Sequence, residues 1–118
     1  MITLNSCEQE TYAHGKRLYE AQCNNCHMED GLGLAKLIPP LAKSDWLKNN
    51  QDNVACILRH GQNGEIIVNG VTYNQEMPGQ KYTEVQITNI INYINNSWGN
   101  DFGVVTLEES TKALKNCK

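Results

Sequence analysis

The chain has 118 residues, of which 40% are hydrophobic and 19% charged, and its formal net charge is −3 at pH 7. That length suits one small domain with a single core. Lys and Arg are scattered along the chain, so no basic run can follow a phosphate backbone, and no apolar stretch approaches the roughly 18 residues of a membrane span. Composition therefore argues against nucleic-acid binding and against a membrane-spanning helix.

The N-terminal third predicts a tail, a helix and a cysteine motif. Residues 1–9 are interpreted as a tail and residues 10–118 as a single domain. Residues 10–22 are predicted to form a helix, because acidic residues lie near its start and Tyr12, Gly15 and Tyr19 share one face. The motif at residues 23–27 follows directly, and then glycines and a proline pair predict loops at 31–34 and 38–41.

The middle of the chain predicts two short helices and a β-hairpin. Ser44 is expected to cap the first helix, and Asp52 to cap the second, which should stop at Gly61. Residues 65–73 place Asn69-Gly70 between β-branched residues, and this dipeptide is the strongest short hairpin signal. A small hairpin is therefore predicted there.

The C-terminal third predicts two more helices. Thr83 and Gln86 form a capping-box pattern, and Ile87, Ile90, Ile91 and Ile94 make one apolar stripe behind it. This helix should stop near residues 98–100, and a further short helix is expected over residues 106–115.

The most informative motif is Cys23-Asn24-Asn25-Cys26-His27. Two cysteines separated by two residues and followed by histidine form the attachment signature of c-type haem, since each thiol adds to one vinyl group and the histidine is held under the iron. A four-cysteine zinc site would need a second close pair, and Cys7, Cys56 and Cys117 are isolated. The motif therefore favours one covalent haem c with His27 as an iron ligand.

The second iron ligand must come from the other face of the ring. Met28 is tethered to the side of His27, and Met1 is terminal, which leaves Met77, in a predicted loop stiffened by Pro78, as the favoured ligand. His60 is the competing ligand, although its position at a helix end also suits a structural role. A bound histidine normally donates its other ring N–H, and the Pro39 carbonyl is the proposed acceptor.

With these residues the chain resembles the class I mono-haem cytochrome c family. The matching pieces are the motif at 23–27, Pro39-Pro40-Leu41, Met77-Pro78 and the two terminal helices, with Gly15 and Tyr19 set to approach the last helix closely. The stretch 66–78 and the ending at 92–99 are similar to a Bacteroidetes-like bacterial subgroup. The resemblance implies an all-α fold with helices wrapped around one covalent haem.

The resemblance also implies an electron carrier, not an enzyme. Its iron cycles between ferric and ferrous, and its partners are redox proteins such as a terminal oxidase, reductase or dehydrogenase of a respiratory chain. Leu41 and the aromatic Trp46 and Tyr73 are expected to line the haem pocket, with Arg59 or Trp46 near a propionate, although Trp46, Arg59 and Tyr73 also suit plain core or surface positions. The alternatives are a gas-sensing or peroxidase-like haem protein, and a haem module of a larger oxidase or dehydrogenase.

Haem attachment and the remaining cysteines indicate the cellular compartment of the protein and a disulfide. Residues 1–6 are too short for a signal peptide, and since haem c is attached outside the bacterial cytoplasm, we expect a precursor to carry that signal. Leu4-Asn5-Ser6-Cys7 loosely resembles a lipobox, so Cys7 is a candidate lipid anchor of a periplasmic monomer. The preferred disulfide is Cys56 with Cys117, and the alternative is Cys7 with Cys117.

Overall fold

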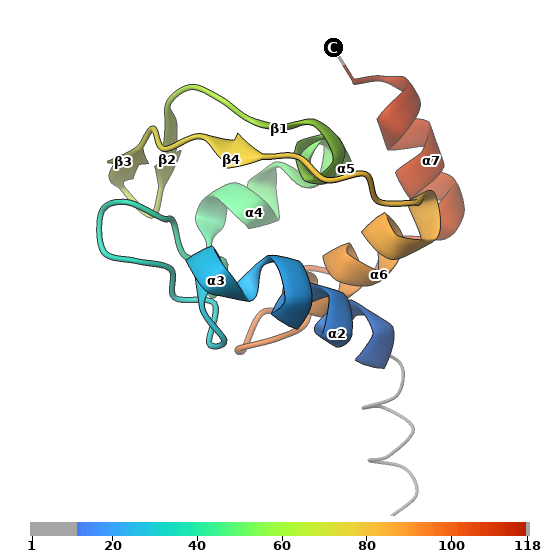
Figure 1. Ribbon diagram of the computed structural model, residues 1–118, viewed down its shortest axis with the longest axis horizontal. Coiled ribbons are helices and arrows are strands. Elements are labelled where there is room, and N and C mark those ends of the chain that lie inside the picture. Colours follow the sequence, from blue (N-terminus) through green and yellow to red (C-terminus); the bar gives the residue numbers. More distant parts are fainter. Residues whose placement is uncertain (1–11, 118) are drawn as a thin grey trace, which may run out of the picture.

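The computed structural model describes residues 12–117, and it is mostly helical (Figure 1). Helices surround the middle of the molecule, and two small two-stranded sheets lie along its upper side in this view. The helices are α2 (Ala13–Gln22), α3 (Asn24–His27), α4 (Asp45–Asn49), α5 (Gln51–His60), α6 (Glu84–Asn95) and α7 (Leu107–Lys115). The helical fold with a small hairpin is as expected, whereas the predicted tail at 1–9 lies outside the described residues.

The core forms where α2 crosses α6. Tyr19 of α2 is buried, and its ring centroid lies 5.5 Å from that of Tyr93 on α6. Ile87 and Ile90 are fully buried, which confirms the apolar stripe predicted for α6. This crossing places the end of α2, and the cysteine motif after it, at the edge of the core. In the part of the chain that the structure describes, no helix has the length and apolar character needed to cross a membrane.

Most helix starts agree with the capping signals. Ser44 Oγ accepts the Leu47 N–H at 3.0 Å, and Thr83 and Gln86 form the predicted reciprocal capping box. The prediction that Asp52 caps α5 was wrong, because α5 begins two residues earlier than such a cap requires, and Asn50 takes the cap position without a side-chain hydrogen bond. Asp52 instead lies in the first turn, where its negative charge interacts favourably with the helix dipole.

The hairpin forms from β2 (Ile66–Val68) and β3 (Val71–Tyr73), as predicted. Asn69 and Gly70 both have positive φ, at 52° and 83°, which is the backbone of the tight turn that matches strand twist. The Asn69 amide N–H donates to Asp45 Oδ1 at 2.7 Å, and the Asp45 N–H donates back to Asn69 Oδ1 at 3.0 Å. These two bonds fix the hairpin to the start of α4.

The segment around Met77 is not the loop that the sequence predicted. Strand β4 (Met77–Pro78) pairs antiparallel with β1 (Gly61–Gln62), so that Met77 lies opposite Gln62. Gly61 ends α5 as predicted, with φ of 87°, and a Cβ there would lie only 2.5 Å from the Met77 carbonyl oxygen. The strand pair requires a glycine at this position, and sequence periodicity gave no sign of it.

Helix α6 ends at Asn95, earlier than the predicted stop near residues 98–100. Trp98 and Gly99 have positive φ values of 55° and 86°, so the backbone has already left the helix. The side chains of this turn instead contact the loop between α3 and α4. The turn and that loop lie close together at the bottom of Figure 1.

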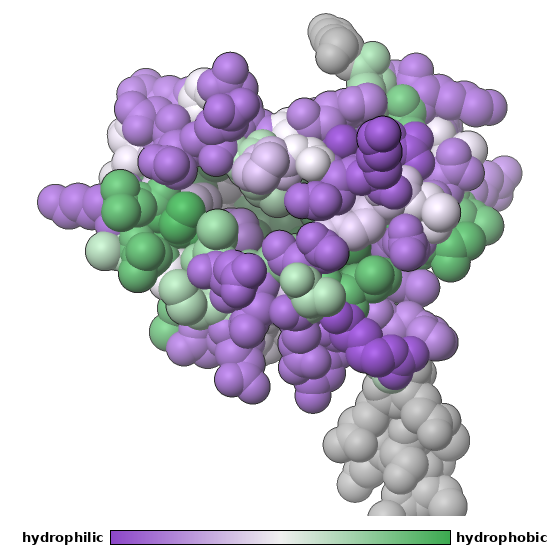
Figure 2. All heavy atoms as spheres, in the orientation of Figure 1, coloured by the Kyte–Doolittle hydropathy of each residue, from purple (hydrophilic) through white to green (hydrophobic). Residues whose placement is uncertain are grey.

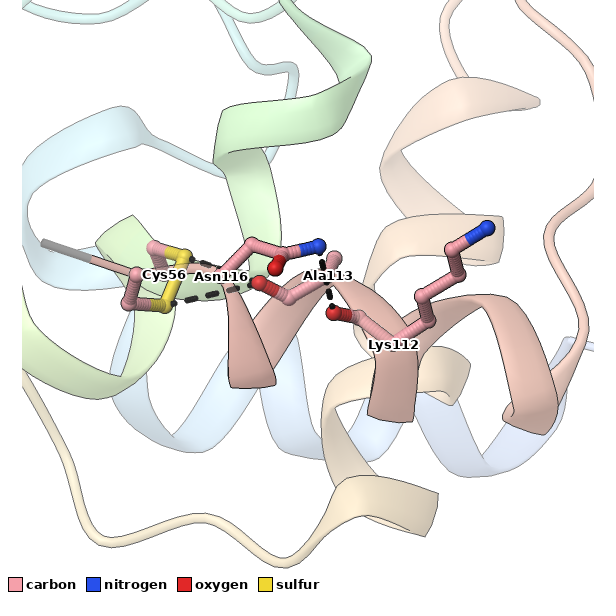
Figure 3. Close-up of a disulfide and its surroundings, with 5 residues drawn as sticks. Cys56, Lys112, Ala113 and Asn116 are labelled. Atoms are coloured by element: carbon pink, nitrogen blue, oxygen red, sulfur yellow. Dashed lines mark hydrogen bonds between the residues drawn. A yellow bond between two sulfur atoms is a disulfide. The ribbon is translucent and has the colours of Figure 1, made fainter.

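Helix α7 is joined to α5 by the Cys56–Cys117 disulfide, which confirms the preferred pairing (Figure 3). The two Cα atoms are 5.7 Å apart. Thr106 and Glu109 form a second capping box at the start of α7, and Asn116 Nδ2 donates to the Lys112 carbonyl at its end, at 3.2 Å. The C-terminal segment is thus a packed part of the domain. Cys7 lies outside the described residues.

Candidate functional site

An apolar cleft lies at the centre of the molecule, between α3 on one side and β4 on the other. Figure 2 shows it as a recess with apolar atoms at its floor and mostly hydrophilic residues around its rim. Side chains from α2, α5, α6 and the hairpin complete its walls. Six of the predicted site residues line it: Cys23, His27, Pro39, Leu41, Trp46 and Met77.

His27 ends the short helix α3 and is 7% exposed. Its Nδ1 donates to the Pro39 carbonyl at 3.0 Å, which is the hydrogen bond predicted from the sequence. Because the carbonyl can only accept, Nδ1 carries the proton and the Nε2 lone pair is left to bind a metal. Burial lowers the pKa of His27, and this keeps the imidazole neutral, as metal ligation requires.

The two motif cysteines differ in their surroundings. Cys23 lies at the junction of α2 and α3 on the cleft wall, and burial raises the pKa of its thiol to about 11. Cys26 lies one helical turn later and is exposed. Neither thiol is in a disulfide. The motif therefore runs from the interior of the cleft to the surface of the protein.

Met77 reaches the cleft from β4, and it is half-buried. Figure 1 shows β4 above α3, and both elements contribute lining residues to the cleft, so Met77 and His27 approach it from different elements. The competing histidine, His60, is exposed and borders a separate groove between α5 and α7. Met28 does not line the cleft either, as its position next to His27 predicted.

Two predicted pocket residues are not brought to the cleft wall. Arg59 Nη2 donates to the Tyr82 carbonyl at 2.9 Å, and this bond ties α5 to the segment before α6. Tyr73 is buried, and its hydroxyl donates to the Ala35 carbonyl at 3.4 Å. In this structure both side chains hold neighbouring segments together. Trp46 alone of the three lines the cleft.

Sequence reasoning missed Asn100. This residue is buried, and its side chain makes hydrogen bonds to Leu41, Lys43 and Ile94. The sequence indicates only a helix stop at this position, because nothing in the local pattern shows that a residue so late in the chain contacts the loop that carries Pro39. A polar residue after an apolar stripe, next to a glycine, is an ordinary helix-end signal.

The residues fit a covalently bound haem. The cleft offers a neutral imidazole with its metal-binding nitrogen free, a thioether on another element, and a thiol on the wall with a second at the surface. Its remaining walls are apolar, which suits the faces of a porphyrin.

Comparison with known proteins decides the family. The family profile of cytochrome c matches residues 12–98. The chain belongs to the cytochrome c family. It is a class I mono-haem cytochrome c that carries covalently attached haem c with iron, and it functions in electron transfer.

Two kinds of relative are similar to this cytochrome. It is 32% identical over 92 residues to cytochrome c-552 of Thermus thermophilus, covering 74% of this chain and 70% of that protein. A second cytochrome c-552 of the same species is also 32% identical over 92 residues, and the match covers 62% of that protein. The chain is also 33% identical over 103 residues to the cytochrome c subunit of a quinone alcohol dehydrogenase from Gluconacetobacter polyoxogenes, covering 83% of this chain but only 22% of that subunit.

Proposed function

We propose that His27 and Met77 are the two axial iron ligands of a one-electron carrier that is not itself an enzyme. The supporting observation is that one apolar cleft receives His27, with its ring oriented by the Pro39 carbonyl, and Met77 from a different element. Bound haem supplies the ferric–ferrous couple, and a thioether ligand raises its potential. The chain's own residues exclude water and hold both ligands in place, which keeps structural change during electron transfer small.

Met77→Ala tests this assignment, and Met28→Leu is its matched control. Loss of the thioether should abolish the far-red sulfur-to-iron absorption band, lower the midpoint potential and allow added imidazole to bind. Met28 does not line the cleft, so Met28→Leu should keep the parent's spectrum and potential. If Met77→Ala matched the parent in all three properties, Met77 would not be the ligand. A parent that binds imidazole readily would instead support the gas-sensing or peroxidase-like alternative.

We place the exit for electrons beside Cys26. This attachment residue is exposed, and the loop that follows α3 carries three exposed leucines, Leu32, Leu34 and Leu37. Figure 2 shows apolar residues gathered over that loop. A small, exposed apolar face of this kind suits transient docking of another redox protein, such as a terminal oxidase, reductase or dehydrogenase. The cytochrome itself acts as a monomer in this proposal.

We assign the protein to a compartment outside the cytoplasm. The Cys56–Cys117 disulfide supports this assignment, because such bonds persist in oxidising compartments and are rare in the cytosol. Since these two cysteines bond each other, Cys7 remains the candidate lipid attachment site. Mass spectrometry of the native protein's N-terminal peptide would show a lipid adduct on Cys7, and an unmodified cysteine would contradict the anchor.

A second role is as a haem module of a larger dehydrogenase. Its support is the match to a quinone alcohol dehydrogenase subunit of which this chain covers only 22%. The mass of the haem-carrying polypeptide purified from its native source separates the two roles. A free-standing carrier would appear near the 13.3 kDa of this chain plus its haem, whereas a module would appear in a much larger polypeptide.

A further inference from the structure

The turn after α6 contacts both ends of the loop between α3 and α4, residues 28–44. At one end of that loop, Trp98 Nε1 donates to the Glu29 carbonyl at 2.8 Å. At the other end, Asn100 Oδ1 accepts the Lys43 N–H at 2.6 Å. The contacts join residues 57 and 69 positions apart in sequence. They matter for function because this loop carries Pro39, the hydrogen-bond partner of His27.

Asn100 is the central residue of this contact. It is 7% exposed, and both of its amide atoms are used. Nδ2 donates to the Leu41 carbonyl at 3.0 Å and to the Ile94 carbonyl at 2.9 Å, while Oδ1 binds the Lys43 N–H. One buried side chain therefore fixes the loop on both sides of Ala42 to the end of α6.

The same stretch of loop is held from within. The N–H groups of Leu41 and Ala42 both donate to the Gly31 carbonyl, at 2.7 and 2.9 Å. A Cβ on Gly31 would lie 2.6 Å from the Trp98 ring, so the indole packs directly on this glycine. The loop is thus closed on itself and anchored to the turn after α6. Pro39 lies two residues before the anchored Leu41, with only Pro40 between them.

We propose that Asn100 is a positioning residue for the proximal iron ligand: it fixes Leu41 and Lys43, and thereby holds the Pro39 carbonyl on His27 Nδ1. This inference rests on the proposed function, in which His27 binds the iron. A hydrogen bond from Nδ1–H to a carbonyl makes the imidazole a stronger donor to the metal, and a stronger donor favours ferric iron. Loss of the anchor should therefore weaken donation and raise the potential.

The test compares Asn100→Ala with Asn92→Ala in the holoprotein. Asn92 is a matched control on α6, since its amide makes two hydrogen bonds to the Val105 backbone, at 3.0 and 2.8 Å, and none to the loop. The readouts are the midpoint potential and, by NMR, the solvent exchange rate of the His27 Nδ1 proton. Asn100→Ala should raise the potential and speed exchange about tenfold or more, because a buried carbonyl that loses its partner favours local opening. Asn92→Ala should lower the melting temperature and leave both readouts at the parent's values.

The proposal is overturned if Asn100→Ala lowers the melting temperature but leaves the potential and the exchange rate unchanged, or if both variants shift them equally. If Asn100→Ala does not fold, exchange in the parent decides. The Lys43 amide and the His27 Nδ1 proton should then share one opening free energy under increasing denaturant, and two separate openings would contradict the proposal. Failure of the proposed function is seen separately, because the parent's His27 ring signals would lack the shifts that iron ligation produces.

Discussion

Gly15 of α2 packs directly against the backbone of Asn89 on α6. A Cβ at position 15 would collide with the Asn89 carbonyl oxygen and lie 2.8 Å from the Tyr93 Cβ. Because the obstacle includes backbone, it cannot rotate away. The position of α2, and with it the cysteine motif, therefore depends on the absence of a side chain at this residue.

Gly15→Ala should separate the two helices and destabilise the protein. The expected loss in free energy of unfolding is about 1–3 kcal/mol, the usual cost of overpacking, despite the better helix propensity of alanine. Denaturant unfolding of the holoprotein measures it. Lys16→Ala, on an exposed position of the same helix, should change stability by less than about 0.5 kcal/mol. Equal stability of Gly15→Ala and the parent would show that the helices can separate without cost.

Removal of the Cys56–Cys117 disulfide should reduce stability without changing the haem site. The chain-entropy estimate for a loop of 61 residues is about 4 kcal/mol, as an upper value. Cys56 and Cys117 border the groove between α5 and α7 and not the apolar cleft. The Cys56→Ser/Cys117→Ser double variant should therefore unfold at lower denaturant concentration, while its spectrum and midpoint potential match the parent's. A shifted potential would mean that α7 contributes to the haem environment.

Interactions between residues close together in the sequence were predicted correctly more often than interactions between distant residues. The capping box at Thr83 and the Asn69-Gly70 turn were predicted correctly because their hydrogen bonds join residues a few positions apart. The cap of α5 was misassigned because Asn50 and Asp52 carry the same kind of local signal. The contacts of Asn100 were missed because they join distant segments and leave no local pattern.

In the candidate site, too, the residues close together in the sequence were predictable and the distant ones were not. The motif at 23–27 holds both attachment cysteines and His27 within five residues, and Pro39, the hydrogen-bond partner of His27, lies in the loop directly after it. Placing Met77 on a strand paired with β1 required the structure, since that pairing depends on Gly61 and the end of α5. Arg59 and Tyr73 could not be placed by residue type, because each makes a backbone hydrogen bond elsewhere.

The face formed by the exposed side chains of Leu32, Leu34 and Leu37 should control electron exchange between molecules. Leu34→Lys and Leu37→Lys each place a charge on the exposed loop beside Cys26, and two copies that meet through this face then repel each other. The electron self-exchange rate, measured by NMR on mixed ferric and ferrous protein, should fall about tenfold at low salt and recover partly at high salt. Val104→Lys, on an exposed residue of the segment before α7, should leave the rate near the parent's. A fall of the same size in Val104→Lys would show that the effect is not specific to the leucine-bearing loop.

Acid should destabilise the folded protein through His27. Burial lowers the pKa of His27 in the folded state, and iron ligation opposes its protonation further, whereas an imidazole released by unfolding titrates near its ordinary value of about 6.5. The contribution of His27 to the free energy of unfolding is therefore fully present above the pKa of the unfolded imidazole. It falls as the pH drops below about 6.5, because the unfolded chain binds the proton first. Denaturant unfolding between pH 7.5 and roughly 5.5 measures the slope.

The exposed histidines provide the control for this titration. The His14→Gln/His60→Gln variant removes both of them and leaves His27 as the remaining histidine. The acid slope should persist in this variant. If the slope disappeared, the exposed histidines would be its source and the burial of His27 would not contribute.

Axial ligation by His27 and Met77 is the central claim, and the absorption spectrum of the oxidised holoprotein at neutral pH tests it most directly. A weak sulfur-to-iron charge-transfer band in the far red, present in the parent and absent in Met77→Ala, is the predicted result. A covalently bound haem with no such band in the parent would contradict the claim, because the sixth position would then be open or held by another group.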